Sequence, residues 1–433
     1  MLSLRLSCFR QLEYYMVMTG NSASSFSLLI KPASADCNLR CAYCFYLERC
    51  SLYGQTKRHR MSRDVLERII SSYMTTEQTQ YSFGWQGGEP TLMGIDFFEK
   101  VVALQKKYGK AGAVVGNGVQ TNATLIDDSL ASFFESYNFL LGVSLDGPEK
   151  LHNTYRVSAT GRGTHNRVVK SIQTLKKHSV EFNILTAVNS ANVKKASEVY
   201  HYLLDNNLFF HQYIPIVEFG DNGESLPFSI RGGEWGEFLC TLFDEWVKFD
   251  VRRVSIRLFD AVLNLLVDSV RVVCTMGSNC CQYFVVEYNG DIYPCDFFVD
   301  SNKLLGNICS SDWQQLLEST AYRNFGARKS RLNSNCIECP YLQLCAGDCL
   351  KHRFYPSLEE RQSSRAAGKR TETQEETQEG EGPDTLSWLC EGWKMFYKHS
   401  LPAFRRMARE VQRARGRERA QERSCSELKF NSC

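Results

Sequence analysis

The sequence predicts an α/β fold, in which a partial barrel of six βα units is followed by a small cysteine-rich α+β domain. Two observations point to it. Short apolar runs alternate with amphipathic stretches from Phe26 to about Val217, and the chain after residue 271 becomes rich in cysteine and turns. Repeated βα units form parallel sheets, because each helix returns the chain to the starting edge of the next strand. With 433 residues, 43% of them hydrophobic, the chain can bury the core that this fold needs.

The strands and helices of the barrel follow from two different periodicities. Six apolar runs have the length and composition of strands: Ser27–Ile30, Tyr81–Trp85, Val114–Gln120, Leu140–Leu145, Phe182–Val188 and Phe209–Val217. Four intervening stretches carry apolar residues at three- and four-residue spacing and predict helices: Asp64–Tyr73, Phe97–Lys107, Asn166–His178 and Val193–Leu204. Further on, the turn Asn289-Gly290 between Tyr283–Tyr288 and Ile292-Tyr293 predicts a hairpin.

These patterns divide the chain into five segments. Residues 1–24 form an N-terminal extension that we expect to be disordered, and residues 25–233 form the barrel. Residues 234–270 are a helical connector whose apolar residues, such as Trp235 and Trp246, are expected in the core. Residues 271–404 form the cysteine-rich domain, interrupted by a polar insertion at 357–384, and residues 405–433 are an arginine-rich tail with the pattern of a solvated helix.

Charge and hydropathy exclude several classes of protein. The net charge is only +3, so the overall balance indicates neither nucleic acid nor a membrane surface as a partner. No stretch approaches the roughly 18 apolar residues of a membrane span. Polar residues from Arg5 to Glu13 interrupt the apolar region that an export signal needs. We therefore expect a cytoplasmic protein, in whose reducing environment the clusters among its 18 cysteines bind metal rather than form disulfides.

The first cysteine cluster has the spacing CxxxCxxC and follows the first predicted strand. Three thiolates from Cys37, Cys41 and Cys44 would leave one iron of a 4Fe-4S cluster open, and S-adenosylmethionine (SAM) can chelate that iron. Tyr43 is placed to lie against the adenine, although ordinary packing explains it equally well. On spacing alone, a zinc ion with a distant fourth ligand remains an alternative.

A second motif, after the second predicted strand, favours SAM over zinc. Gly87 and Gly88 allow the backbone to approach a ligand, and Glu89 offers a carboxylate to the ammonium group of SAM. Thr121-Asn122 and Asp146-Gly147-Pro148 follow the next two strands in the same way, where barrels of this kind place their chemistry. Each could by itself be a simple turn.

A second group of cysteines lies in the C-terminal half. Its eight members are enough for two fully ligated 4Fe-4S clusters: Cys274, Cys280, Cys295, Cys336, Cys339, Cys345, Cys349 and Cys390. A zinc ribbon is the structural alternative for the run at 336–349. Asp296, directly after Cys295, is a candidate general base, and its alternative is a turn or capping residue.

Together these motifs resemble the anaerobic sulfatase-maturating enzymes, radical SAM proteins with a SPASM domain. The resemblance runs from about Phe26 to about Phe404 and rests on stretches such as SLLIKPASADCNLRCAYCFY, FGWQGGEPTL, VSLDGPEKLHN and VVEYNGDIYPCDFF. It implies that the chain oxidises an active-site cysteine or serine of a sulfatase to Cα-formylglycine. The substrate would be a sulfatase polypeptide with a Cys/Ser-x-Pro/Ala-x-Arg motif, and a flavodoxin or ferredoxin would supply electrons.

The resemblance also implies roles for individual residues. Ser144 and, with less support, Asp146 would contact SAM, while Tyr46 and Gln86 would line the active site and Asp296 would be the general base. The downstream cysteines would divide into two ligand sets for auxiliary 4Fe-4S clusters. The first set is Cys274, Cys280, Cys295 and Cys349, and the second set is Cys336, Cys339, Cys345 and Cys390.

Two other functions remain open on the sequence alone. One is a different SPASM-type radical SAM maturase that forms a thioether or other crosslink in a peptide. The other is a noncatalytic zinc-binding protein in which the cysteines are structural.

Overall fold

The computed structural model describes residues 25–54, 57–220, 223–353 and 386–430, with side chains described up to residue 417. The predicted N-terminal extension at 1–24 and the polar insertion at 357–384 lie outside the described residues.

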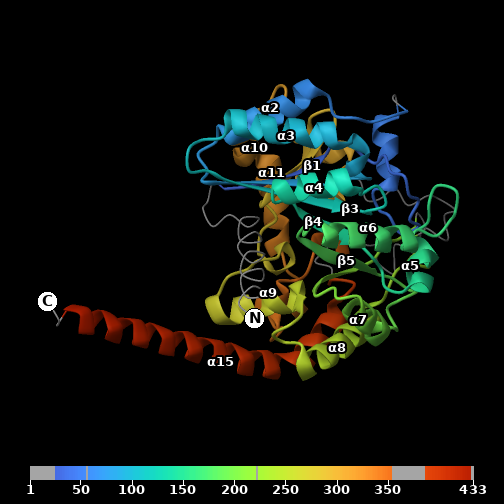
Figure 1. Ribbon diagram of the computed structural model, residues 1–433. Helices are drawn as coiled ribbons and strands as arrows, with labels where there is room; N and C mark the ends of the chain where they lie inside the picture. The colour runs from blue at the N-terminus through green and yellow to red at the C-terminus, as the bar shows by residue number, and fades with distance from the viewer. Residues whose placement is uncertain (1–24, 55–56, 221–222, 354–385, 431–433) are drawn as a thin grey trace.

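A single open sheet of ten strands runs through the molecule, in the order β10-β9-β8-β1-β2-β3-β4-β5-β6-β7. Its first six strands in the chain pair in parallel, each with the next (Figure 1). They are β1 (Ser27–Lys31), β2 (Gln80–Trp85), β3 (Val114–Thr121), β4 (Leu140–Ser144), β5 (Phe182–Val188) and β6 (Phe210–Pro215). The predicted α/β fold with a partial, unclosed barrel is thereby confirmed, and a short strand β7 (Ser255–Ile256) extends it beyond β6.

The cysteine-rich half adds its strands to the same sheet. Strand β8 (Tyr283–Glu287) pairs in parallel with β1, with Ser27 opposite Tyr283 and Lys31 opposite Glu287. Strands β9 (Asp291–Tyr293) and β10 (Gly306–Asn307) continue the sheet in antiparallel pairing. The predicted hairpin is confirmed, and the sheet crosses the boundary predicted at residue 271.

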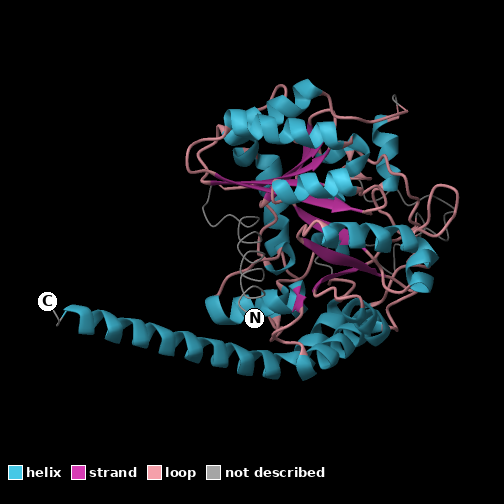
Figure 2. Cartoon of the chain, viewed as in Figure 1, coloured by secondary structure: helices cyan, strands magenta, loops and turns pink. Residues whose placement is uncertain are grey.

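Helices cover the sheet (Figure 2). Those of the barrel are α2 (Arg63–Met74), α3 (Ile95–Tyr108), α4 (Asp128–Ser136), α5 (Glu149–Tyr155), α6 (His165–Lys177) and α7 (Ala196–Asp205). Aromatic side chains fill the core between helices and strands, as where the Tyr73 ring of α2 packs against Phe83 and its hydroxyl donates to the Phe26 carbonyl at 2.6 Å. This packing fixes the strand ends from which the site residues project.

A second core joins the connector to the C-terminal helix. Helices α8 (Gly232–Phe249), α9 (Arg257–Asp268) and α15 (Cys390–Phe430) pack Trp246, Phe259 and Phe404 together. The expectation that the apolar residues Trp235 and Trp246 are buried is confirmed. Helix α15 continues without a break through the boundary predicted at 404 and extends away from the body of the molecule (Figure 1). In its arginine-rich part, Arg415 pairs with Asp268 at 2.6 Å.

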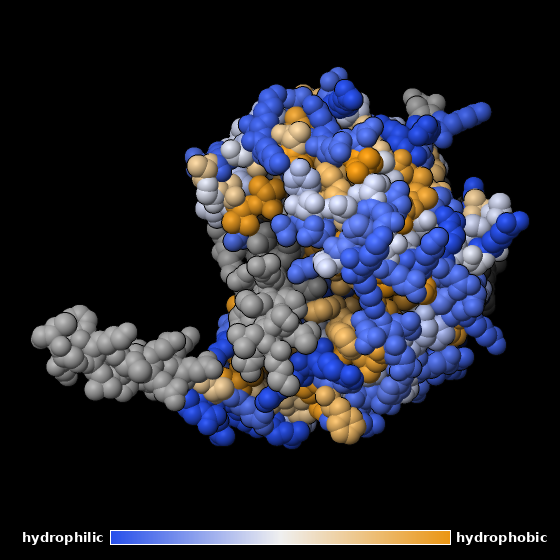
Figure 3. Space-filling model, viewed as in Figure 1, coloured by the Kyte–Doolittle hydropathy of each residue, from blue (hydrophilic) through white to orange (hydrophobic). Residues whose placement is uncertain are grey.

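Short helices carry the rest of the cysteine-rich half. They are α10 (Trp313–Glu318), α11 (Thr320–Ala327), α12 (Ser334–Ile337) and α13 (Leu342–Cys345). Hydrophilic residues cover most of the face shown in Figure 3, with hydrophobic areas scattered between them. Among the described residues, none of the helices combines the length and hydropathy required to cross a bilayer.

Candidate active site

The loop with Cys37, Cys41 and Cys44 leaves the carboxyl end of β1 and is tied to the loop after β2. The Gly88 amide donates to the Ser34 carbonyl at 2.7 Å, and the Glu89 amide donates to the Asp36 carbonyl at 2.8 Å. A Cβ on Gly88 would lie 2.0 Å from the Asp36 oxygen, so only glycine permits this approach. The approach of a ligand to these glycines stays a prediction, and the structure shows that Gly88 lies against the cysteine loop itself.

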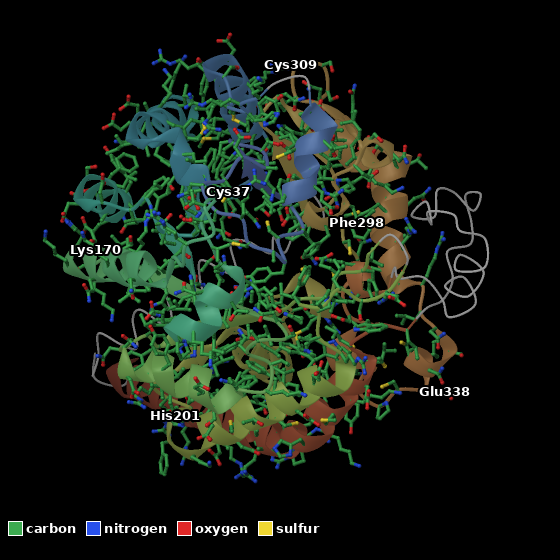
Figure 4. All side chains as sticks on the ribbon, turned by 90° about the vertical axis from the view of Figure 1, so that its right-hand side faces the viewer. Cys37, Lys170, His201, Phe298, Cys309 and Glu338 are labelled. Carbon is green, nitrogen blue, oxygen red and sulfur yellow. The ribbon has the colours of Figure 1, made fainter. Side chains whose placement is uncertain are left out.

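The three thiols of this loop share one environment. Burial raises the pKa of Cys37 to about 12 and that of Cys41 to about 11, and the charges of Cys41 and Cys44 also raise the pKa of Cys37. Metal coordination deprotonates such thiols outright. Three thiolates on one loop are the donors that a 4Fe-4S cluster with one open iron requires. Cys37 lies toward the middle of the molecule in Figure 4.

The Glu89 side chain is wholly buried and binds other parts of the protein. Its Oε1 accepts hydrogen bonds from the Thr91 hydroxyl at 2.6 Å and the Thr121 hydroxyl at 2.7 Å, and its Oε2 accepts from the Asn122 amide at 2.8 Å. Burial raises the pKa of Glu89, against the effect of these donors. The carboxylate thus joins the ends of β2 and β3, and its contact with SAM stays a prediction.

Asp146 is likewise engaged by neighbouring residues. Its carboxylate accepts hydrogen bonds from the Tyr43 hydroxyl and from the Ala187 amide, the latter at 3.0 Å, and pairs with Arg156 at 3.1 Å. Arg156 also lies 4.0 Å from the Cys41 sulfur. Ser144, the last residue of β4, precedes Asp146 by two positions in the sequence and is buried. Asp146 therefore links Tyr43, which is part of the cysteine loop, to Arg156.

A buried group of charged residues surrounds Asp296. Its carboxylate forms an ion pair with Lys31 at the end of β1 and accepts a hydrogen bond from Gln86 Nε2 at 3.2 Å. The Lys31 ammonium lies 4.3 Å from the centre of the Tyr46 ring, and the Tyr46 hydroxyl donates to Glu287. Three residues predicted for the reaction, Gln86, Tyr46 and Asp296, are therefore brought together around one lysine.

The downstream cysteines lie in two groups, and their division into two ligand sets stays a prediction. In the first set, burial raises the pKa of Cys349 and of Cys280. The negative charges of Cys274 and Cys295 raise the pKa of Cys349 further, and that of Cys274 does the same for Cys280. In the second set, all four members line one cavity, beside Trp393 and Lys394: Cys336, Cys339, Cys345 and Cys390. Cys274 is the exposed member of its set. Both groupings have the sulfur donors that a 4Fe-4S cluster requires.

Both the barrel and the cysteine-rich half of the chain match known families. Residues 32–203 match the Radical SAM superfamily, and residues 274–340 match SPASM, an iron-sulfur cluster-binding domain. The serine-type anaerobic sulfatase-maturating enzyme of Bacteroides thetaiotaomicron is 36% identical over 90% of this chain and 92% of its own length. The chain belongs to the anaerobic sulfatase-maturating enzymes.

Other members of the family agree with this assignment. The cysteine-type anaerobic sulfatase-maturating enzyme of Clostridium perfringens is 34% identical over 89% of this chain and 99% of its own length. A solved structure of the native enzyme anSMEcpe with bound AdoMet and a peptide, Cp18Cys, superposes with a TM-score of 0.76 at 33% identity, over 89% of this chain and 99% of that one.

Membership of the anaerobic sulfatase-maturating enzymes decides between the metals left open by spacing. Radical SAM enzymes use SAM and a 4Fe-4S cluster, and the SPASM domain binds auxiliary iron-sulfur clusters. The noncatalytic zinc protein is thereby set aside.

Three residues of the site were missed by the sequence analysis. Lys31 pairs with Asp296, Arg156 pairs with Asp146, and Glu287 accepts a hydrogen bond from the Tyr46 hydroxyl. A lysine that ends an apolar strand beside the CxxxCxxC loop was the one available signal for Lys31, because burial of such a charge requires a partner.

Gly88→Ala is expected to destabilise the enzyme by about 1–3 kcal/mol, as overpacking does, since the new methyl group would displace the cysteine loop. Thermal unfolding and the iron content after anaerobic reconstitution measure the two effects. Gly54→Ala is the matched control, because its Cβ would meet its nearest neighbour at 3.7 Å. Equal melting temperatures and iron contents for the two variants would contradict the close approach.

Proposed function

We propose that this chain oxidises an active-site cysteine or serine of a sulfatase to Cα-formylglycine. The observation that carries the proposal is the match, over about nine tenths of the chain, to both serine-type and cysteine-type sulfatase-maturating enzymes. A peptide substrate is supported by the related structure that holds a peptide beside AdoMet. The predicted division of this chain into core, connector and SPASM segments is part of the proposal.

The oxidation removes one hydrogen atom, one proton and one electron from the target side chain. When bound, SAM and the cluster at Cys37, Cys41 and Cys44 supply a 5′-deoxyadenosyl radical for the hydrogen atom at Cβ. Asp296 accepts the proton from the thiol or hydroxyl. Gln86 and Lys31 hold the two carboxylate oxygens of Asp296 in place, so that the acceptor is oriented before the peptide binds.

The charged group around Asp296 lies between the upstream and downstream cysteines. Burial raises the pKa of the upstream Cys44, and the positive charge of Lys31 opposes this effect. Asp296 directly follows Cys295 of the first downstream set. The two downstream sets would hold auxiliary clusters able to accept the remaining electron. With a cysteine target, water then hydrolyses the thioaldehyde, so that its oxygen becomes the aldehyde oxygen and the sulfur leaves as hydrogen sulfide. We also propose an external donor of the flavodoxin or ferredoxin kind for the starting electron.

Peptide turnover tests the function. The reconstituted enzyme, SAM and a reductant are incubated with two peptides that differ only in carrying cysteine or serine in the Cys/Ser-x-Pro/Ala-x-Arg motif. We expect an aldehyde that reacts with a hydrazine, together with 5′-deoxyadenosine, and the relative rates identify the preferred target. A peptide in which the target is alanine is the control.

A crosslinked product without a carbonyl group would instead favour a SPASM-type maturase that forms thioethers. Formation of 5′-deoxyadenosine at the same rate with the alanine peptide, and no aldehyde from either target, would reject sulfatase maturation.

A further inference from the structure

Lys329 is a buried lysine between segments that carry the downstream cysteines. Its side chain is 1% exposed, and its ammonium group donates hydrogen bonds to the Thr275 carbonyl at 3.0 Å and to the Asp348 carbonyl. Thr275 directly follows Cys274, and Asp348 directly precedes Cys349. The ammonium group is thus held against two ligand segments of the first set.

Burial lowers the pKa of Lys329, and the nearby Asp348 carboxylate opposes this effect and favours the charged ammonium. Both hydrogen-bond acceptors of Lys329 are neutral carbonyl oxygens, and the Asp348 carboxylate accepts instead from His352 Nδ1 at 2.8 Å and the Ser387 hydroxyl at 2.7 Å. A charge buried in this way acts over longer range than one in water, because little solvent screens it.

The turn between the two sets is also fixed. Cys345 belongs to the second set and Cys349 to the first, so residues 346–348 connect one set to the other. Arg353, which is buried, donates to the Gly347 carbonyl at 2.6 Å and the Ala346 carbonyl at 3.0 Å. Lys329 and Arg353 together therefore hold this turn by its carbonyl oxygens, and the Lys329 charge has a defined place relative to both sets.

Lys394 differs from Lys329, because it is exposed and lines the cavity of the second set beside Cys336 and Cys390. The two lysines provide a comparison between a buried charge shared by both sets and a surface charge beside one of them.

We propose that Lys329 is a positioning residue that raises the reduction potentials of the iron-sulfur clusters held by both downstream sets. A buried positive charge stabilises the reduced, more negative form of a nearby cluster, and local charge is one of the factors that set cluster potentials. The electron released by peptide oxidation then has a more favourable acceptor. The inference rests on the proposed function for the assignment of the two ligand sets.

The test is a potentiometric titration of the anaerobically reconstituted full chain, followed by electron paramagnetic resonance. Lys329→Met removes the charge at similar side-chain length. We expect both downstream clusters to shift to lower potential, by about tenfold in the one-electron equilibrium constant, which corresponds to 59 mV. Lys394→Met is the matched control, for which we expect a shift confined to the second set.

Lys329→Gln keeps donors for the carbonyl oxygens while removing the charge, and it separates structure from electrostatics. Unchanged potentials in either variant with full iron content would overturn the inference, and so would loss of iron from both variants, because Lys329 would then be structural. The ligand assignment is judged separately on the unmodified chain. If that chain binds only about four irons, the two downstream sets are wrong whatever Lys329 does.

Discussion

Cys41→Ala is expected to abolish cleavage of SAM and to remove about four irons per chain. Cys41 is one of three sulfurs on the loop after β1, and two thiolates cannot hold a cluster whose fourth iron must stay open to SAM. Even residues that only touch a metal ligand change metal affinity by about 10–100-fold when replaced, so loss of a ligand should exceed that range. Iron analysis and chromatography of 5′-deoxyadenosine measure the two effects.

Cys50→Ala is the matched control for this prediction. Cys50 lies close in sequence, on the helical turn Leu47–Tyr53, but its side chain is exposed and belongs to neither of the proposed ligand groups. We expect its variant to retain all iron and full cleavage of SAM. Similar iron contents for the two variants would remove Cys41 from the cluster.

Asp296→Asn is expected to lower peptide oxidation by about 10²–10⁴-fold, the usual contribution of a general base. Asparagine fills the same space and can still accept from Gln86, but it cannot take the thiol or hydroxyl proton. Cleavage of SAM should continue, because Asp296 has no role in it. The ratio of aldehyde to 5′-deoxyadenosine therefore reports the effect directly, and full aldehyde formation would exclude Asp296 as the base.

The ion pair with Lys31 calls for a second variant beside Asp296→Asn. Removing one partner of a buried pair leaves a charge uncompensated and can cost about 3–5 kcal/mol, so the melting temperature must be recorded with the rate. The double variant Lys31→Met, Asp296→Asn removes both charges and should recover stability but not peptide oxidation. Asp300 lies on the same loop, where its carboxylate accepts a hydrogen bond from the Asn302 amide. The control variant Asp300→Asn should leave the product ratio unchanged.

The strands of the barrel were predictable because their apolar runs are bounded by turns and carry the motifs at their ends. Helix α4 was not predicted, although Asp127 caps it by accepting from the Leu130 amide at 2.9 Å. The pairing of β8 with β1 was not predicted either. Periodicity identifies a strand and its buried face, but it contains no information about which distant strand lies beside it.

The site was predictable where one residue type has one chemistry. Cysteine spacing indicated the candidate metal ligands, and the position of Asp296 beside Cys295 suggested a base, a role that stays a prediction. Lys31, Arg156 and Glu287 were missed because each acts through a partner that is distant in sequence. A charged side chain in an apolar run shows that a partner is needed, but the partner is found only when the chain is folded.

The parallel pairing of β1 with β8 has a consequence for synthesis of the chain. Strand β1 leaves the ribosome early, and its partner from Tyr283 onward follows only after the whole barrel has been made. Until then one edge of β1 has unpaired backbone groups, and such edges can pair with other chains. Final closure of the fold therefore awaits the strands that come with the downstream cysteines, so a nascent chain interrupted before residue 283 would lack both its sheet edge and its partner for Lys31.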